Sequence, residues 1–473
     1  MRRIIYAVLT PVIVAAVLLG SLSVYAVGSA ERITLEPVVY LGEESAAREL
    51  WVTFRSDLGN SLFFESEYTF GGELFTEYRF SSLGEDDQIE RGHYGFRMTS
   101  SFRAGVDLTS DKSELSGIEL AYRELYEDTE IGAIGSRVIE LSDYYDYYPI
   151  NLSIDIPGVI WHGGYDDIFA FKSYYPFELT PTAEDQRRIL SHFTEYFKIP
   201  VPDGIEYEIT LRREEKDVSG VGIKSITRDY ELTTRSTADG ESCYFGFNTD
   251  YNGGEVDTSL IPGGRGIYKF DYTNGFGART GIDYESLTIL YPLEDGVELL
   301  SLNVSADGER LHAYTDNGGV TELLVIDKES GELLDTVNFD GGWLWCCIEG
   351  DGFIINFGKT ATELFSVTDG VYERVLTVNP EKRQKEFLER ALRGVYTSAL
   401  DFSEDRLAIV SYPIDREADY LSATGFELMI LDPSGISYHA SYYSSLSTHR
   451  DWSDGTNNPS YTVRDPFDIS WNN

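Results

Sequence analysis

The side chains most often used in catalysis do not form a known catalytic pattern in this sequence. The histidines are widely spaced and none belongs to a His-x-x-x-His or His-Glu-x-x-His motif: His93, His162, His192, His312, His439 and His449. A zinc hydrolase is therefore disfavoured, and no Gly-x-Ser-x-Gly elbow indicates an acyl transferase. Among 80 Asp and Glu residues no pair stands out as acid and nucleophile, so the sequence leaves the catalytic residues unknown.

Three loops have compositions that could bind a ligand. Residues 262–266 (Pro-Gly-Gly-Arg-Gly) lack the Gly-Lys-Ser/Thr ending of a phosphate loop and lead into an expected strand, which indicates a hairpin connection. Residues 250–255 and 451–457 offer oxygen ligands for Ca²⁺, but neither has the ligand spacing of a known calcium loop. We therefore expect no bound cofactor or metal, with Ca²⁺ as the alternative.

The cysteines and tyrosines suit structural roles. Only Cys243, Cys346 and Cys347 are present, which is neither a disulfide framework nor a metal set. Neighbouring residues on a strand point to opposite faces, so we expect no bridge between Cys346 and Cys347. The tyrosine-rich segments 144–148 and 174–175 would suit adhesive contacts with protein or glycan, or could simply populate strands.

The charge of the chain excludes one class of partner. A formal net charge of −42 repels phosphate backbones, so we expect no nucleic acid ligand. The composition is 42% hydrophobic and 14% aromatic, which is enough apolar surface for a folded core.

The N-terminus contains a membrane-targeting segment. Arg2 and Arg3 precede an uncharged stretch, residues 4–28, which as a helix would be about 37 Å long against a hydrocarbon core of about 30 Å. Positive charge before the stretch and acidic residues after it predict a cytoplasmic N-terminus and an extracytoplasmic body. The prediction is a single-pass anchor over residues 1–28 that is retained in the mature protein. The alternative is a signal peptide that is cleaved to give a secreted protein, because Val-Tyr-Ala at 24–26 suits cleavage.

The body contains an internal repeat. The turn Ala-Asp-Gly-Glu at 238–241 recurs at 306–309, and two further turns recur in the same order, with short β-rich runs between them. Two more copies follow, over 353–378 and 400–435. Gly275, Gly331, Gly370 and Gly435 occupy the same turn in the four copies, with gaps of 56, 39 and 65 residues.

These units resemble the blades of YVTN-type and WD-repeat-like β-propellers. The resemblance covers residues 230–446 and is clearest over 305–311 and 325–333, although no Trp-Asp dipeptide closes a strand. It implies an all-β propeller and specifies no activity. Because four-stranded blades are stable only when stacked in a ring, we expect about seven of them.

The predicted organisation is an anchor (1–28), a linker (29–45) and one propeller (46–473). Helical insertions are expected near residues 180–197 and 380–394, and strands are expected over 50–54, 61–70, 94–98 and 118–125. The alternative is a separate α/β domain over 46–230 followed by a smaller propeller.

The functional expectation is a non-catalytic binding, sensing or scaffold protein outside the membrane. Its ligand would be a protein or a glycan, and the membrane would be contacted through the N-terminal helix. The alternative is a propeller hydrolase of the glycoside hydrolase or lactonase type, for which two carboxylates, one with a raised pKa, would be the indication.

Overall fold

The computed structural model describes most of the chain beyond residue 33. The described residues are 17, 20–21, 34–57, 62–72, 74–80, 95–100, 108–115, 117–156, 159–163, 172–173, 183–227, 230–251, 257–272, 281–342, 346–393, 398–411, 425–444 and 467–471. Among them no helix has the length and apolar character that crossing a bilayer requires. The anchor segment 4–28 lies almost entirely outside these ranges, so its retention stays a prediction.

The described chain is mostly β, with few helices, and is organised in antiparallel sheets of which six have four or more strands. It divides into two units, Glu90–Asn338 and the combination of Met1–Ile89 with Phe339–Asn473. The alternative of a separate α/β domain over 46–230 is wrong, because the strands of that range are shared between the two units.

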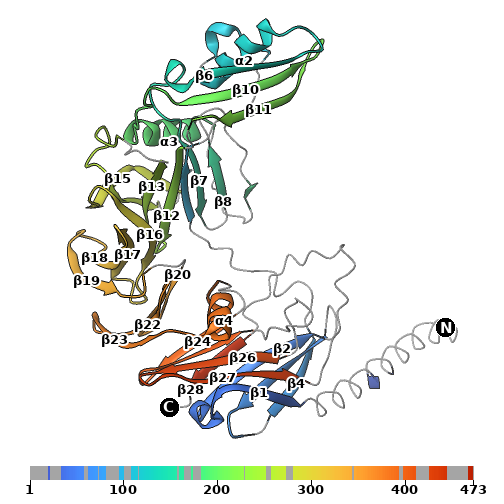
Figure 1. Ribbon diagram of the computed structural model, residues 1–473, viewed down its shortest axis with the longest axis vertical. Helices are drawn as coiled ribbons and strands as arrows, with labels where there is room; N and C mark the ends of the chain where they lie inside the picture. Colours follow the sequence, from blue (N-terminus) through green and yellow to red (C-terminus); the bar gives the residue numbers. More distant parts are fainter. Residues whose placement is uncertain are drawn as a thin grey trace, which may run out of the picture. The chain divides into compact units, whose positions relative to one another are not determined.

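The unit Glu90–Asn338 contains three four-stranded sheets (Figure 1). They are β5-β7-β8-β9 (Gly95–Thr99, Asn151–Ile156, Val159–Gly163, Lys172–Ser173), β12-β13-β14-β15 (Tyr230–Ala238, Ser242–Tyr251, Gly266–Tyr272, Ile282–Pro292) and β16-β17-β18-β19 (Val297–Val304, Arg310–Asn317, Val320–Asp327, Leu333–Phe339). β12 packs against β5 on one side and β16 on the other. The first strands of successive sheets thus lie side by side.

The same unit carries an inserted module, defined here as α2 (Gly117–Asp128), β6 (Ile134–Glu140), β10 (Glu206–Arg213) and β11 (Val218–Ser225). Its three strands form a sheet in the order β11-β10-β6, and α2 packs on β6 and β10. This sheet is not a four-stranded blade. Where about seven four-stranded blades were expected, the described chain has five sheets of four strands, one of five and this one of three. The short helices η2 (Lys112–Glu114) and η3 (Leu141–Asp143) flank the module.

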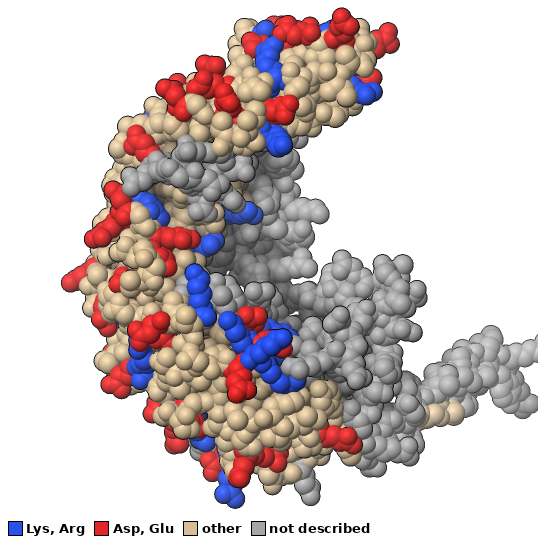
Figure 2. Space-filling model, in the orientation of Figure 1, with Lys and Arg blue, Asp and Glu red and all other residues tan. Residues whose placement is uncertain are grey.

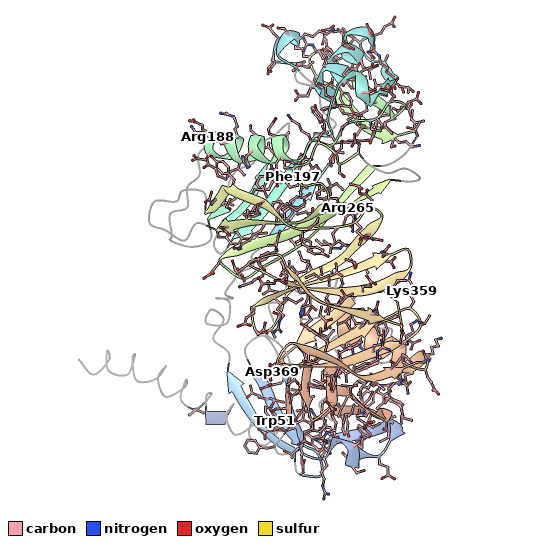
Figure 3. The ribbon with its side chains drawn as sticks, turned by 90° about the vertical axis from the view of Figure 1, so that its left-hand side faces the viewer. Trp51, Arg188, Phe197, Arg265, Lys359 and Asp369 are labelled. Carbon is pink, nitrogen blue, oxygen red and sulfur yellow. The ribbon has the colours of Figure 1, made fainter. Side chains whose placement is uncertain are left out.

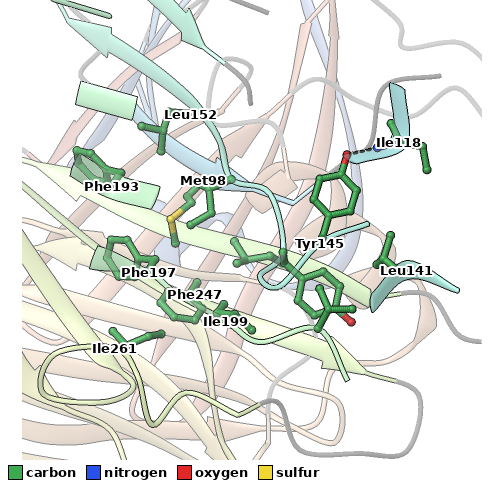
Figure 4. Packing of buried hydrophobic residues seen from close by; sticks show 14 of the residues in the cluster. Met98, Ile118, Leu141, Tyr145, Leu152, Phe193, Phe197, Ile199, Phe247 and Ile261 are labelled. Atoms are coloured by element: carbon green, nitrogen blue, oxygen red, sulfur yellow. Dashed lines mark hydrogen bonds between the residues drawn. The ribbon is translucent and has the colours of Figure 1, made fainter. Parts of the chain in front are cut away.

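The prediction of a strand over 118–125 is wrong, because this segment is most of helix α2. Its buried residues are spaced by three or four positions, the period of a helix face: Ile118, Ala121, Tyr122 and Leu125. Gly117 begins the helix at φ +56°, and a side chain there would collide with the Tyr145 ring. The Tyr145 hydroxyl accepts a hydrogen bond from the Ile118 amide at 2.8 Å (Figure 4), which satisfies a donor that a helix start leaves unpaired.

Helix α3 (Ala183–Tyr196) confirms the predicted helix near 180–197. Ile189, Phe193 and Phe197 of this segment are buried, and Figure 4 shows Phe193 and Phe197 among the residues of the core. The Phe193 and Phe197 rings lie 6.4 and 5.9 Å from Phe245 of β13. One apolar core therefore joins α3, the module, the sheet β5-β7-β8-β9 and the sheet β12-β13-β14-β15, and a separate cluster packs the sheet β16-β17-β18-β19 against Tyr244 and Ile267.

The second unit also contains three sheets. They are β20-β21-β22-β23 (Cys346–Gly350, Phe353–Phe357, Thr362–Thr368, Val371–Val378), β28-β2-β3-β4 (Phe467–Trp471, Leu50–Asp57, Leu62–Thr69, Leu74–Phe80) and a five-stranded sheet, β1-β27-β26-β25-β24 (Leu35–Gly42, Gly435–Ser444, Gly425–Asp432, Arg406–Ser411, Ser398–Ser403). The linker expected over 29–45 is wrong in part, because it contains β1 and the start of η1 (Glu44–Ala47). Helix α4 (Lys382–Arg393) confirms the predicted insertion near 380–394.

The repeat predicted from turn glycines is confirmed for three of its four members. Gly331, Gly370 and Gly435 each lie between the third and fourth strands of a sequential meander, with φ of +72°, +77° and +126°. Positive φ explains why glycine recurs there. Gly275 lies outside the described residues.

The two chain ends are tied into this unit by strand pairing. β28 pairs antiparallel with β2, so the C-terminal strand completes a sheet whose other strands are near the N-terminus. β1 pairs with β27 and adds a fifth strand to its sheet.

Candidate functional site

The structure places most sequence candidates in structural roles. His312 and His439 are buried, and His192 of α3 packs on Tyr284 with ring centroids 5.3 Å apart. Tyr145 and Tyr148 are core residues, so the segment 144–148 is mainly packing and not an adhesive patch. The segment 174–175 and the side chains of His93, His162 and His449 lie outside the described residues.

The interpretation of residues 262–266 as a hairpin connection is confirmed. Residues 262–266 end the connection between the paired strands β13 and β14, as expected for a hairpin. Arg265 points inward and donates a hydrogen bond to Asn248 Oδ1 at 3.0 Å; its position is marked in Figure 3. The candidate Ca²⁺ loop 451–457 and most of 250–255 lie outside the described residues.

The metal-ligating side chains that are described do not gather into a site. No group of three His, Cys, Asp or Glu residues in the described ranges has metal-binding geometry. Cys243 is free and buried, and burial raises the pKa of its thiol. The side chains of Cys346 and Cys347 are not described, so the absence of a bridge between them stays a prediction.

The most concentrated group of charges is a buried ionic cluster between α4 and the five-stranded sheet. Glu427 of β26 is 2% exposed and contacts Arg390 at 3.0 Å, Arg383 at 3.4 Å and His439 Nε2 at 2.8 Å. The Arg383 guanidinium also lies over the Tyr40 ring of β1, 3.4 Å from its centroid. The cluster therefore joins the helix, two sheet strands and the added N-terminal strand.

The sequence positions these groups through ordinary periodicity. Arg383 and Arg390 are seven residues apart, two helical turns, and so lie on the α4 face that also buries Phe387. Glu427 and His439 lie on adjacent antiparallel strands, where Glu427 pairs with Ser441 and His439 with Met429. They are diagonal neighbours on one face of the sheet.

The electrostatics of the cluster favour an ionised Glu427. Burial raises the pKa of this carboxyl, but the hydrogen bond with His439 and the charges of Arg390 and Arg383 outweigh burial and hold the pKa below its ordinary value. Burial lowers the pKa of Arg390. His439 Nδ1 is buried without a hydrogen-bond partner among the described residues.

A carboxylate in this setting is suited to structure and not to proton donation. A general acid needs a raised pKa, whereas Glu427 is held ionised by two guanidinium groups. Removing one partner of a buried ion pair leaves an uncompensated charge, so the cluster fixes α4 in one position.

A second buried carboxylate, Glu363 of β22, also serves the fold. It is fully buried and accepts hydrogen bonds from the backbone amides of Asp340 and Gly341 at 3.2 and 2.9 Å. Asn356 donates another at 3.1 Å, and Arg374 lies 3.4 Å away. Glu363 thus satisfies the backbone where the chain enters the sheet of β20–β23.

The carboxyl groups with resolved pKa shifts all move in the same direction. Burial, the largest effect on several of them, raises the pKa, but hydrogen bonds and nearby cations outweigh it: the pKa is lowered for Glu127, Asp239, Asp257, Asp307, Asp327, Glu427 and Asp432. Several are turn residues; Asp327 accepts from the Ser330 amide at 2.7 Å. None of these groups has the raised pKa of a glycosidase acid.

The other feature with functional character is the free edge of β6. This strand pairs with β10 alone among the described residues. Three apolar residues are exposed here: Ile131 in the turn before β6 (62%), and Ile134 (67%) and Val138 (54%) on the strand. An open strand edge with apolar side chains is a binding surface or an aggregation hazard. No local pattern predicts this edge, because it depends on the pairing of β6 with β10, which is distant in sequence.

Comparisons with known proteins give no family. No protein-family model matches the chain, and no curated protein matches it. The chain is similar to a putative 6-phosphogluconolactonase from Bacteroides fragilis at 10% identity and TM-score 0.28, covering 82% of this chain and 93% of that one. It is similar to the Swd1 β-propeller domain of Myceliophthora thermophila at 10% identity and TM-score 0.24, covering 66% and 86%.

A further similarity is to oligopeptidase B from Leishmania major, at 12% identity and TM-score 0.26, covering 84% of this chain and 49% of that one. Similarities at these TM-scores establish neither a shared activity nor a shared fold.

Proposed function

We propose that this chain is an extracytoplasmic binding protein built on a β-propeller and tethered to the membrane by its N-terminal segment. Its sheets form the scaffold, and its ligand is bound without chemical change.

Strand order supports the propeller. Sequential four-stranded meanders repeat with the same turn glycines, and sheets that follow one another in the chain pack together within each unit. β28 completes the sheet of β2–β4, which is the pairing by which a ring of blades joins its two ends. The tether is supported by the apolar length of residues 4–28.

The observation that favours binding over hydrolysis is the direction of the carboxyl pKa shifts. A glycosidase needs one carboxyl group with a raised pKa beside a second carboxylate. The resolved shifts lower the pKa instead, and the buried Glu427 is committed to two arginines.

The test is to recover a bound ligand and determine whether it is intact. The full chain is immobilised and exposed to panels of oligosaccharides, lactones and peptides at pH 5 to 8. Retained compounds are eluted and identified by mass spectrometry. Elution of unchanged ligand is expected. Release of hydrolysed product by the intact protein, and not by the heat-denatured protein, would contradict the proposal.

A further inference from the structure

The register of β6 determines which of its backbone groups face outward. The Leu141 amide donates to the Ile205 carbonyl at 2.8 Å, and the Arg213 amide donates to the Ala133 carbonyl at 3.1 Å. In an antiparallel pair such contacts recur at every second residue, so the odd-numbered residues between them face β10. The amides and carbonyls of Ile134, Ser136 and Val138 therefore point to the open edge.

The β6 edge has neither the proline, the lysine nor the bulge by which proteins often prevent strand pairing. Native edges are protected by proline, lysine, inward-pointing charges or bulges. β6 has the sequence Ile-Gly-Ser-Arg-Val-Ile-Glu, with a regular register to β10 and no proline or lysine. Its only cation, Arg137, is turned to the α2 side, where it pairs with Glu124 and Asp128.

The face of the sheet away from α2 carries apolar and acidic side chains along β6, and the register adds Arg212 beside Ile134 and Lys224 beside Glu208. Ile134 and Val138 project from this face and are exposed. In the pairing with β10, Val138 lies opposite Glu208, and Glu140 lies opposite Glu206. None of the ion pairs of the described residues includes these three carboxylates. In Figure 2 acidic and basic side chains are interspersed on the visible face of the module.

We propose that the β6 edge binds an extended, cationic segment of a partner protein by adding it as a fourth, antiparallel strand to the sheet of the module. The backbone groups of Ile134, Ser136 and Val138 supply the hydrogen bonds. On the face away from α2, the bound segment places Lys or Arg beside the carboxylates and β-branched residues beside Val138 and Ile134. This rests on the proposed binding function and specifies its site and partner chemistry.

The first test isolates one backbone donor. The probe is a short fluorescent peptide with the sequence Lys-Thr-Val-Thr-Thr-Thr-Ile. Ser136→Pro removes the outward N–H, which an edge strand tolerates, whereas Ser136→Ala removes the same hydroxyl and keeps the N–H. We expect Ser136→Pro to weaken peptide binding by about tenfold or more and Ser136→Ala by less than about threefold.

The second test concerns charge. Replacing both Glu206 and Glu208 by Gln should weaken binding of the Lys peptide by about fivefold at low salt. Binding of a peptide with Thr in place of Lys should be unaffected. The control is Glu373→Gln, an exposed carboxylate on β23, which should change neither affinity.

The outcomes separate this inference from the proposed function. If both Ser136 variants bind the probe like the unchanged chain, the β6 edge is not the site, although the protein still binds. Concentration-dependent self-association of the chain that Ser136→Pro abolishes would show that a second copy occupies the edge and would overturn the inference. Thermal melting of each variant within a few degrees of the unchanged chain excludes misfolding.

Discussion

Two helices in this protein cover sheets in physically different ways. Helix α4 is held over the five-stranded sheet by Glu427, which is 2% exposed and contacts two arginines of the helix. Helix α2 is held by apolar side chains, and its ion pairs lie at the rim, where the Glu124 and Asp128 side chains are 33% and 69% exposed.

The difference indicates where the protein is fixed and where it is open. Buried ionic partners tolerate little displacement, because a separated charge in the interior is costly. Rim ion pairs contribute little and leave the adjacent strand edge available. The region of α4 is therefore suited to holding the scaffold together, and the region of α2 and β6 to contact with a partner.

The largest effect is expected at Glu427. Glu427→Gln should lower the free energy of unfolding of its unit by about 3–5 kcal/mol, because two guanidinium groups lose their buried counter-charge. Glu124→Gln on α2, measured in the same urea titration, should cost less than about 1 kcal/mol. Equal costs for the two changes would remove the contrast between the helices.

The same contrast should be visible in the pH dependence of stability. The folded-state pKa of Glu427 is lowered from its ordinary value of 4.5, so its contribution is complete above that value and is lost as pH falls through the lower, folded-state pKa. The melting temperature of the unchanged chain should fall more steeply below about pH 4.5 than that of Glu427→Gln. Parallel curves would show that Glu427 is not held ionised by the fold.

A smaller effect is expected at the start of α2. Tyr145→Phe leaves the buried Ile118 amide without its acceptor and should cost about 1–3 kcal/mol in urea unfolding. Tyr147→Phe is the matched control, because Tyr147 is 38% exposed, and it should be neutral. A neutral Tyr145→Phe would mean that the helix start finds another partner.

The smallest effect is expected at the rim of the module. Arg137→Gln removes the ion pairs with Glu124 and Asp128 and should cost less than about 1 kcal/mol, falling toward zero in 1 M salt. Calorimetry at low and high salt measures the difference. A cost that salt leaves unchanged would indicate that Arg137 acts through packing of its side-chain stem.

Local patterns allowed much of the scaffold to be predicted from sequence. Positive-φ turns at Gly331, Gly370 and Gly435 are properties of a few adjacent residues, and α4 begins just after Pro380 and ends before Gly394. The error at 118–125 has a local cause too. Its Ile, Leu and Tyr residues were taken as a β-rich run, whereas their spacing is that of a helix face.

Long-range pairings could not be predicted in this way. Glu427 meets Arg383 only because α4 folds back onto a strand some forty residues further along the chain. The pairing of β28 with β2 joins opposite ends of the sequence, and no local pattern specifies such a partner. The open edge of β6 likewise depends on knowing that β10, distant in sequence, is its neighbour.

Site-resolved amide hydrogen exchange of the full chain, with and without the alternating Lys, Val, Thr and Ile peptide, tests most directly whether β6 is the binding edge. In the free protein Ile134, Ser136 and Val138 should exchange quickly, and Gly135, Arg137 and Ile139 slowly, because only the second set faces β10. The peptide should slow the first set and leave the second unchanged. Protection of Ile134, Ser136 and Val138 in the free protein, or peptide-induced protection confined to other strands, would contradict the account.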